Sequence, residues 1–288
     1  MDSRNPVLNS AIDKAEKEYA GSGALAAEGS SAYQQAATAG TAAAAGTSAA
    51  DLESMYARAA RGEATMQLPD VVAKTGLMFV VLLVGAAIGW TTWESSPFIL
   101  FGSMLIALGL GIANAVKRKV SPLLVMLYAF FEGVFLGGIS AWYQYSPSIN
   151  PDGAPLVQQA VLGTLVAFGV MLFLYQSRII KVNGTFAKVM MVAIISYALI
   201  GLASLIAALF GVGGGWGFYG VGGLGIILCV IGVGLAAFTL ALDFEAISQG
   251  INAGMPERES WRMAFGLMVT LVWLYLEILR FLAILQRS

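Results

Sequence analysis

Histidine is absent from the 288 residues, and only one cysteine, Cys229, is present. Without histidine the chain cannot build a Ser-His-Asp triad, a Cys-His pair, an HExxH zinc site or an imidazole pH sensor. One cysteine cannot form an internal disulfide or a cysteine-based zinc site, and we expect Cys229 to be a small buried hydrophobe. Any group that changes charge in function must therefore be a carboxylate, Cys229 or an amine.

Charged side chains are scarce throughout the chain. They make up 11% of the residues, against about 25% in a typical soluble domain, while hydrophobic residues make up 58% and the mean hydropathy is +0.77. The 16 Lys and Arg and 17 Asp and Glu give a formal net charge of -1, without the basic patch that nucleic-acid binding requires. The composition excludes an ordinary soluble enzyme and a nucleic-acid partner, and indicates a lipid bilayer as the surroundings.

The beginning of the chain differs in composition from the rest. Residues 1–74 hold 15 of the 33 charged side chains. Residues 1–19 lack the apolar stretch of a cleavable signal peptide, and residues 20–50 are almost wholly Ala, Gly, Ser and Thr, which predicts a disordered tether. Short helices are expected at residues 51–64 and from the Leu68-Pro-Asp start, both on the membrane surface.

Beyond the tail the chain contains seven apolar runs. Each is near the 20 residues that a helix needs to cross about 30 Å of hydrocarbon. The runs predict an all-α polytopic membrane protein, with a flexible cytoplasmic tail over residues 1–70 and a seven-helix transmembrane domain over residues 71–288. The expected spans are Thr75–Trp93, Pro97–Val116, Pro122–Tyr143, Leu156–Tyr175, Val189–Phe210, Val221–Leu242 and Met263–Leu285.

Lysine and arginine are confined to alternate loops. Fourteen of the sixteen fall in the tail and in the second, fourth and sixth loops, whereas the first, third and fifth loops have none. Because basic loops stay on the cytoplasmic side, the N-terminus is expected inside and, with seven spans, the C-terminus outside. The exceptions are Arg280 and Arg287, and a re-entrant last segment would instead leave both termini in the cytoplasm.

Aromatic and glycine residues mark the membrane boundary and the helix contacts. The glycine-rich fifth loop, residues 211–225, lacks the Gly-Lys-Ser/Thr ending of a phosphate-binding loop and is expected to form a flexible outer hairpin. Gly85 with Gly89, and Gly133 with Gly137, have the spacing that lets helices approach closely, although among 34 glycines each pair is as easily incidental. Seven aromatic residues gather at the predicted outer boundary, where amphipathic rings are favoured: Trp90, Trp93, Trp142, Tyr143, Tyr145, Trp216 and Tyr219.

Four charged side chains lie in or at the ends of the predicted spans, where a charge at the membrane centre costs about 2.5–3.5 kcal/mol on insertion scales. They are Glu132, Asp243, Glu277 and Arg280. Glu132 lies ten residues past Pro122, about 15 Å below the inner surface. The plain structural alternatives are a neutral, hydrogen-bonded Glu132, an interfacial Asp243 and a self-contained Glu277–Arg280 ion pair at i,i+3 spacing. The cost of burial makes all four functional candidates.

Carboxylates without histidine, paired cysteine or a carbonyl-rich filter suit two tasks, binding of a hard cation and transfer of protons. Two carboxylates in contact would share a proton and titrate as a pair, which would make a pH-responsive latch. The chain lacks the Gly-x-Gly-Asp motif of an intramembrane aspartyl protease, and no nucleophile with a base partner is visible. We therefore expect neither an enzyme nor a bound cofactor.

Three segments resemble the Bax inhibitor-1 family: FEGVFLGGIS in the third span, ALDFEAI at the end of the sixth and LVWLYLEILRFLAIL in the seventh. With RNPVLN near the start and QLPDVVAKTG before the first span, they are most similar to its bacterial Bax inhibitor-1/YccA-type branch, which implies the bacterial plasma membrane. The resemblance covers roughly residues 70–285. It implies a bundle whose seventh helix is surrounded by the other six, and a pH-sensitive calcium leak.

The resemblance also implies that an acid ending the sixth span and an acid in the seventh form a proton-sensing pair. These map onto Asp243 and Glu277, with Glu132 and Arg280 as cation or latch partners and Ca2+ held at Asp243, Glu277 and Glu132. In the family the seventh-span acid is usually Asp, and simple depth places Glu132, rather than Asp243, nearer to Glu277. The expected function is a leak channel or exchanger for Ca2+ or another cation. The alternative is a non-conducting regulator of membrane-protein quality control or stress survival that acts by contact with another membrane protein, such as a membrane protease.

Overall fold

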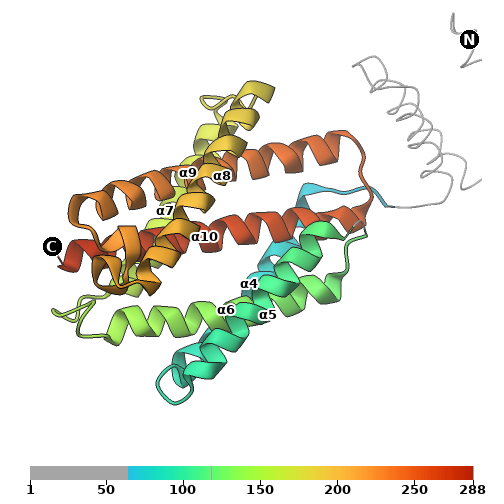
Figure 1. The fold of residues 1–288 in the computed structure, drawn as a ribbon. Helices are drawn as coiled ribbons and strands as arrows, with labels where there is room; N and C mark the ends of the chain where they lie inside the picture. Colours follow the sequence, from blue (N-terminus) through green and yellow to red (C-terminus); the bar gives the residue numbers. More distant parts are fainter. Residues whose placement is uncertain (1–63, 118, 288) are drawn as a thin grey trace, which may run out of the picture. The chain divides into compact units, whose positions relative to one another are not determined.

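Seven long helices make up the part of the chain that the computed structural model describes, residues 64–117 and 119–287, and no strand is found there. Each helix is long and apolar enough to cross a membrane. The predicted all-α architecture with seven spans is therefore confirmed (Figure 1). The helices are α4 (Leu68–Thr92), α5 (Pro97–Val116), α6 (Pro122–Tyr145), α7 (Leu156–Gln176), α8 (Gly184–Leu209), α9 (Gly222–Asn252) and α10 (Ser260–Arg287).

Local sequence signals set most of the helix starts. The backbone N–H of Gln67 donates to the Asp70 carboxylate at 3.0 Å, and a proline occupies the first turn of α4, as the Leu68-Pro-Asp start predicts. Proline also stands in the first turn of α5 and of α6. At α8 the side chain of Asn183 accepts a hydrogen bond from the N–H of Phe186 at 2.7 Å. The expected tether at residues 20–50 and nearly all of the expected helix at 51–64 lie outside the described residues.

The sixth span is longer than its apolar run. The run ends at Leu242, but α9 continues to Asn252 and stops just before Gly254, which has a left-handed φ of 58°. Asp243 therefore lies inside α9 and not at its end. The polar residues after Leu242 end the contact with hydrocarbon without ending the helix. The last segment, α10, is a single helix of 28 residues, about 42 Å long at helical rise, and not a re-entrant hairpin.

Helix α10 is the central helix of the bundle. It packs against α4, α6, α7 and α9, and Figure 1 shows it passing between them. In its most apolar stretch 61% of residues are buried, against 11% for α5, which lies at the periphery. The expected central position of the seventh helix is confirmed, and it explains how two charges are tolerated there: α10 has little surface in contact with lipid.

Glycine allows α4 and α6 to pack at very short range. Gly85 and Gly89 on α4 and Gly133 and Gly137 on α6 face the other helix, and a Cβ added at any of the four would overlap a main-chain oxygen across the contact. No side chain fits between the two backbones at these points. Both predicted GxxxG pairs therefore lie in a helix interface, the most extensive one between described helices.

The aromatic residues of the predicted outer boundary form two groups at one end of the bundle. Tyr145 packs against Trp90 and Trp93, at centroid distances of 5.5 and 6.3 Å. Trp216 stacks on Trp142 at 5.8 Å and meets Tyr143 edge-on. The glycine-rich loop that carries Trp216 forms two single-turn 3-10 helices, η1 (Val212–Gly215) and η2 (Gly217–Gly220), packed on α8, and not an open hairpin.

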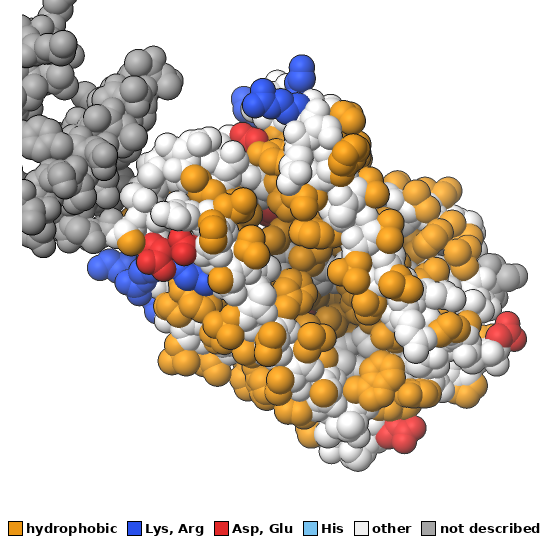
Figure 2. All heavy atoms as spheres, turned by 180° about the vertical axis from the view of Figure 1, so that it is seen from behind, with side chains coloured by type: hydrophobic (Ala, Val, Ile, Leu, Met, Phe, Trp, Pro, Cys, Tyr) orange, Lys and Arg blue, Asp and Glu red, His pale blue; other side chains and the backbone are white. Residues whose placement is uncertain are grey.

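At the other end, the segment before α4 is tied to the turn between α9 and α10. The N–H of Met66 donates to the carbonyl oxygen of Met255 at 2.7 Å, and the Met66 side chain is fully buried. Lys74 forms an ion pair of 2.9 Å with Glu257 and lies over the ring of Trp261. Figure 2 shows hydrophobic side chains spread across the face seen from behind, and most of the visible charged groups toward its margins.

Candidate functional site

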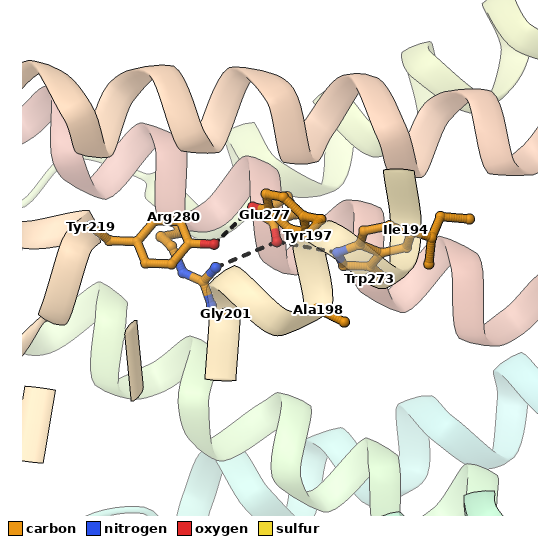
Figure 3. A pocket seen from close by; sticks show the side chains of 8 residues that line it. All are labelled: Ile194, Tyr197, Ala198, Gly201, Tyr219, Trp273, Glu277 and Arg280. Carbon is orange, nitrogen blue, oxygen red and sulfur yellow. Dashed lines mark hydrogen bonds and ion pairs between the residues drawn. The ribbon is translucent and has the colours of Figure 1, made fainter. Parts of the chain in front are cut away.

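The carboxylate of Glu277 lies in the middle of the bundle and is fully engaged. The residue is 3% exposed, on the buried face of α10. Its Oε2 accepts a hydrogen bond from the Tyr197 hydroxyl of α8 at 3.0 Å, and its Oε1 accepts from Trp273 Nε1 at 3.1 Å and from the Arg280 guanidinium at 3.4 Å. Figure 3 shows these polar ends converging on Glu277. Three donors compensate the cost of burying this charge.

Arg280 is the second charged member of this cluster. It forms the i,i+3 ion pair with Glu277 that the spacing predicted. The guanidinium also lies 4.5 Å from the ring centroid of Tyr219 in η2, and it interacts with the buried side chain of Tyr143 on α6. The ion pair is therefore not self-contained, because aromatic residues from two other elements complete its surroundings.

The hydroxyl groups form a chain that ends at the carboxylate. Tyr219 donates to the Tyr197 hydroxyl at 2.9 Å, and Tyr197 in turn is the donor to Glu277. A glycine of α9, Gly232, makes this convergence possible, because a Cβ there would overlap the Tyr197 hydroxyl and crowd the Glu277 carboxylate. Donors and acceptors are thus aligned toward Glu277, which leaves its carboxylate little capacity for another partner.

A cavity of about 410 Å³ adjoins this cluster. Its walls come from α8, from η2, which follows α8 closely in the sequence, and from α10 (Figure 3). The lining residues are Ile194, Tyr197, Ala198, Gly201, Tyr219, Trp273, Glu277 and Arg280.

Asp243 lies between α9 and α10 at a different level. Its Oδ1 faces Gly266, where an added Cβ would lie 3.8 Å away, and its carboxyl group interacts with the side chain of Thr270. Its Oδ2 is buried and has no hydrogen-bond partner among the described residues. A buried carboxyl oxygen in this state is costly, which sets Asp243 apart from the fully engaged Glu277.

The structure does not bring Asp243 and Glu277 together. Helices α9 and α10 are antiparallel neighbours, with Gly232 opposite Glu277 and Asp243 opposite Gly266. Eleven residues separate the two contact points on each helix, which corresponds to about 16 Å at helical rise. The proton-sharing pair expected from the resemblance is therefore not formed, and the α10 residue that meets Asp243 is Thr270, a hydroxyl in place of an acid.

Glu132 is half-buried on α6, one turn beyond Tyr128, with which it interacts. Tyr128 packs edge-on against Phe265 of α10 at 5.0 Å, next to the residue that Asp243 faces. Glu132 therefore belongs to the level of Asp243 and not, as depth alone suggested, to that of Glu277. Over residues 64–117 and 119–287 no three acidic, cysteine or histidine side chains converge in a way that could hold a metal ion. The expected calcium site of Asp243, Glu277 and Glu132 together is therefore wrong, because the three acids lie at two levels.

The partners of Glu277 and of Asp243 were not among the functional candidates from the sequence. Trp273 stands four residues before Glu277, so helical spacing would have found it. Tyr219 was expected only as an aromatic residue of the outer boundary, and no sequence signal marks Tyr197 or Thr270. Their contacts depend on helix orientations that packing sets.

The sequence as a whole matches one protein-family model, described as Bax inhibitor 1 like, over residues 5–287. The chain belongs to this family. A comparison with curated proteins finds no match. Membership and the seven apolar helices together make this a multi-pass membrane protein of the Bax inhibitor 1 like family, with a lipid bilayer as its surroundings.

Proposed function

We propose that this protein is a leak channel or exchanger for Ca2+ or another cation, and that protonation of Asp243 controls it. The supporting observation is the buried Asp243 oxygen that lacks a hydrogen-bond partner among the described residues. A proton or a passing cation would compensate that oxygen, and carboxylate oxygens are preferred ligands of hard cations. The Thr270 hydroxyl interacts with Asp243 and can accept or donate a hydrogen bond as the carboxyl changes its charge.

Glu132 is the second acid of the proposed pathway. It lies on α6 near the level at which Asp243 meets α10 from α9, so the two acids flank the same part of the central helix from different sides. Glu277 and Arg280 have another role in this proposal. Their hydrogen bonds to α8 and contacts with η2 hold the outer half of α10 in place, and this half serves as the barrier against which the pathway opens.

Calcium flux into liposomes at about pH 6, 7 and 8 tests the proposal. Asp243→Asn removes the titratable group at this position. The flux of this variant should therefore be the same at all three pH values, and it should match the flux of the wild type at about pH 6. Glu132→Gln should lower the flux while keeping its pH dependence. The matched control is Glu245→Gln, which removes an acid two residues from Asp243 that is held by Tyr175 and Gln249 on another face of α9.

Two results would count against this function. A pH dependence that survives Asp243→Asn, or that Glu245→Gln removes equally, would show that Asp243 is not the controlling group. If the wild type and all variants match empty liposomes, the conduction proposal is wrong. The alternative function would then be favoured, a non-conducting regulator of membrane-protein quality control or stress survival that acts by contact. A membrane protease would be among the partners to test.

We also infer that the protein lies in a bacterial plasma membrane with its N-terminus in the cytoplasm. The turns after α5, α7 and α9 carry lysine or arginine, and the turns after α4, α6 and α8 carry none. Under the positive-inside rule this distribution supports an orientation with the start of α4 inside and the end of α10 outside. An epitope tag after the last residue should be accessible from outside intact spheroplasts, and access from the cytoplasm alone would contradict this orientation.

A further inference from the structure

The cavity beside Glu277 lies about 16 Å along α10 from Asp243, the acid proposed to control cation passage. At about 410 Å³ it falls within the size range of ordinary ligand sites. Its chemistry is divided: charged and aromatic groups come from α10, from η2 and from Tyr197 of α8, and the rest of the α8 wall is apolar (Figure 3). Such a division suits a molecule with a polar head and an apolar chain.

The charge that the cavity presents to a ligand is positive. The Glu277 side chain is 5% exposed and bound by three donors, whereas the Arg280 side chain is 31% exposed. A guanidinium has five N–H donors, and those of Arg280 are shared with Glu277, at 3.4 Å, and with Tyr143. Arg280 lines the cavity, so a remaining N–H group can donate to an acceptor there, and a phosphate or carboxylate matches the fork of donors best.

Apart from Tyr197, the wall formed by α8 is apolar and notched. Ile194, Ala198 and Gly201 lie at i, i+4 and i+7 on one face of the helix. Ala198 is exposed, and a Cβ added at Gly201 would have nothing within 4 Å. Large apolar residues next to them, including Leu199 and Leu202, are exposed as well and face the lipid. The cavity is thus open along α8, and an acyl chain can run from it into the bilayer.

The level of the site also fits a lipid head group. Arg280 touches Tyr143 and Tyr219, two of the aromatic residues that mark the outer membrane boundary. Arg280 lies near this outer boundary, whereas the basic residues of the tail and the loops all lie on the predicted cytoplasmic side. A bound anionic group would compensate this charge at the depth where phosphates of the outer leaflet lie.

We propose that the cavity between α8, η2 and α10 binds one anionic amphiphile from the outer leaflet, with its phosphate or carboxylate head on Arg280 and its acyl chain in the notch of α8. The occupancy of this site is measured without any flux, so its test does not depend on the proposed cation pathway.

Native mass spectrometry of delipidated protein in maltoside detergent tests the site, because the detergent carries no phosphate or carboxylate. Four probes separate the head from the chain: dioleoylphosphatidate and oleate carry both, dioleoylglycerol carries the chains alone, and inorganic phosphate is the head alone. One molecule of dioleoylphosphatidate or oleate should bind per protein, and dioleoylglycerol and inorganic phosphate should each bind about tenfold more weakly or worse.

Three variants check where the probe binds. Arg280→Lys keeps the charge but loses the planar fork, and it should raise the apparent Kd for dioleoylphosphatidate about tenfold. Gly201→Phe places a ring in the notch at a position where an added Cβ meets no atom within 4 Å, and it should abolish the single bound lipid. The control Gly169→Phe places the same side chain on α7 at another glycine with open space around it, and it should bind as the wild type does.

The possible results separate the explanations. Equal binding of dioleoylglycerol would show that the head is not recognised, and equal binding of inorganic phosphate would make this a small-anion site; either result overturns the proposal. Binding that survives Gly201→Phe, or that Gly169→Phe removes equally, places the lipid elsewhere on the helical surface and also overturns it. None of these results depends on whether the protein conducts cations.

Discussion

A double-mutant cycle on Glu277 and Arg280 tests whether the two charges stabilise the fold as a pair. Arg280→Met leaves a carboxylate that is 5% exposed, with two remaining donors and no opposite charge. Removing one partner of a buried pair costs about 3–5 kcal/mol, and this site is near the lower end because Tyr197 and Trp273 still donate. We expect about 3 kcal/mol of lost stability.

Glu277→Gln should cost less, about 2 kcal/mol. The Arg280 side chain that it leaves behind is 31% exposed and lines the cavity, so water can hydrate it, but the new amide nitrogen then faces a donor. The double variant removes both charges, so it should cost much less than the two single variants together. The resulting coupling energy is about 2–3 kcal/mol.

Reversible unfolding in mixed maltoside and dodecyl sulfate micelles, followed by helical circular dichroism, measures the cycle in lipid-free protein. The order of the single variants is as informative as the coupling, because it follows from the unequal exposure of the two side chains. Single effects that add to within about 0.5 kcal/mol, or a larger cost for Glu277→Gln than for Arg280→Met, would refute this account of the pair.

Three further predictions concern packing and the surface. Gly137→Ala should destabilise the protein by about 1–3 kcal/mol because the new methyl group overlaps the α4 backbone, whereas Gly102→Ala on α5 meets no atom within 4 Å and should be neutral or stabilising; unfolding in mixed micelles compares them. Cys229, which is fully buried, should react with a membrane-permeant maleimide only after unfolding, and fast labelling of the native protein would show that the α9 interior is open. Lys74→Met should cost less than about 1 kcal/mol, with a loss that shrinks at high salt, because its partner Glu257 is 47% exposed.

The sequence determined the membrane architecture because the physical signals for it are local. A run of about 20 apolar residues specifies a spanning helix wherever the rest of the chain lies, and proline or asparagine at the start of a run sets where the helix begins. The Glu277–Arg280 ion pair was predictable for the same reason, since three residues on one helix bring two side chains together. The end of α9 was not, because the loss of hydropathy after Leu242 marks the end of lipid contact and not the end of the helix.

Contacts between helices were decided by the tertiary structure alone. Each depends on the rotation of a helix about its axis and on its offset along its neighbour, and hydropathy encodes neither. The offset between α9 and α10 separates Asp243 from Glu277 by about 16 Å and brings Asp243 next to the Thr270 side chain. The rotation of α8 brings Tyr197 to Glu277 and opens the cavity at Ala198 and Gly201. The sequence identified the charged residues in and next to the spans, and the packing of the helices decided which partners each of them has.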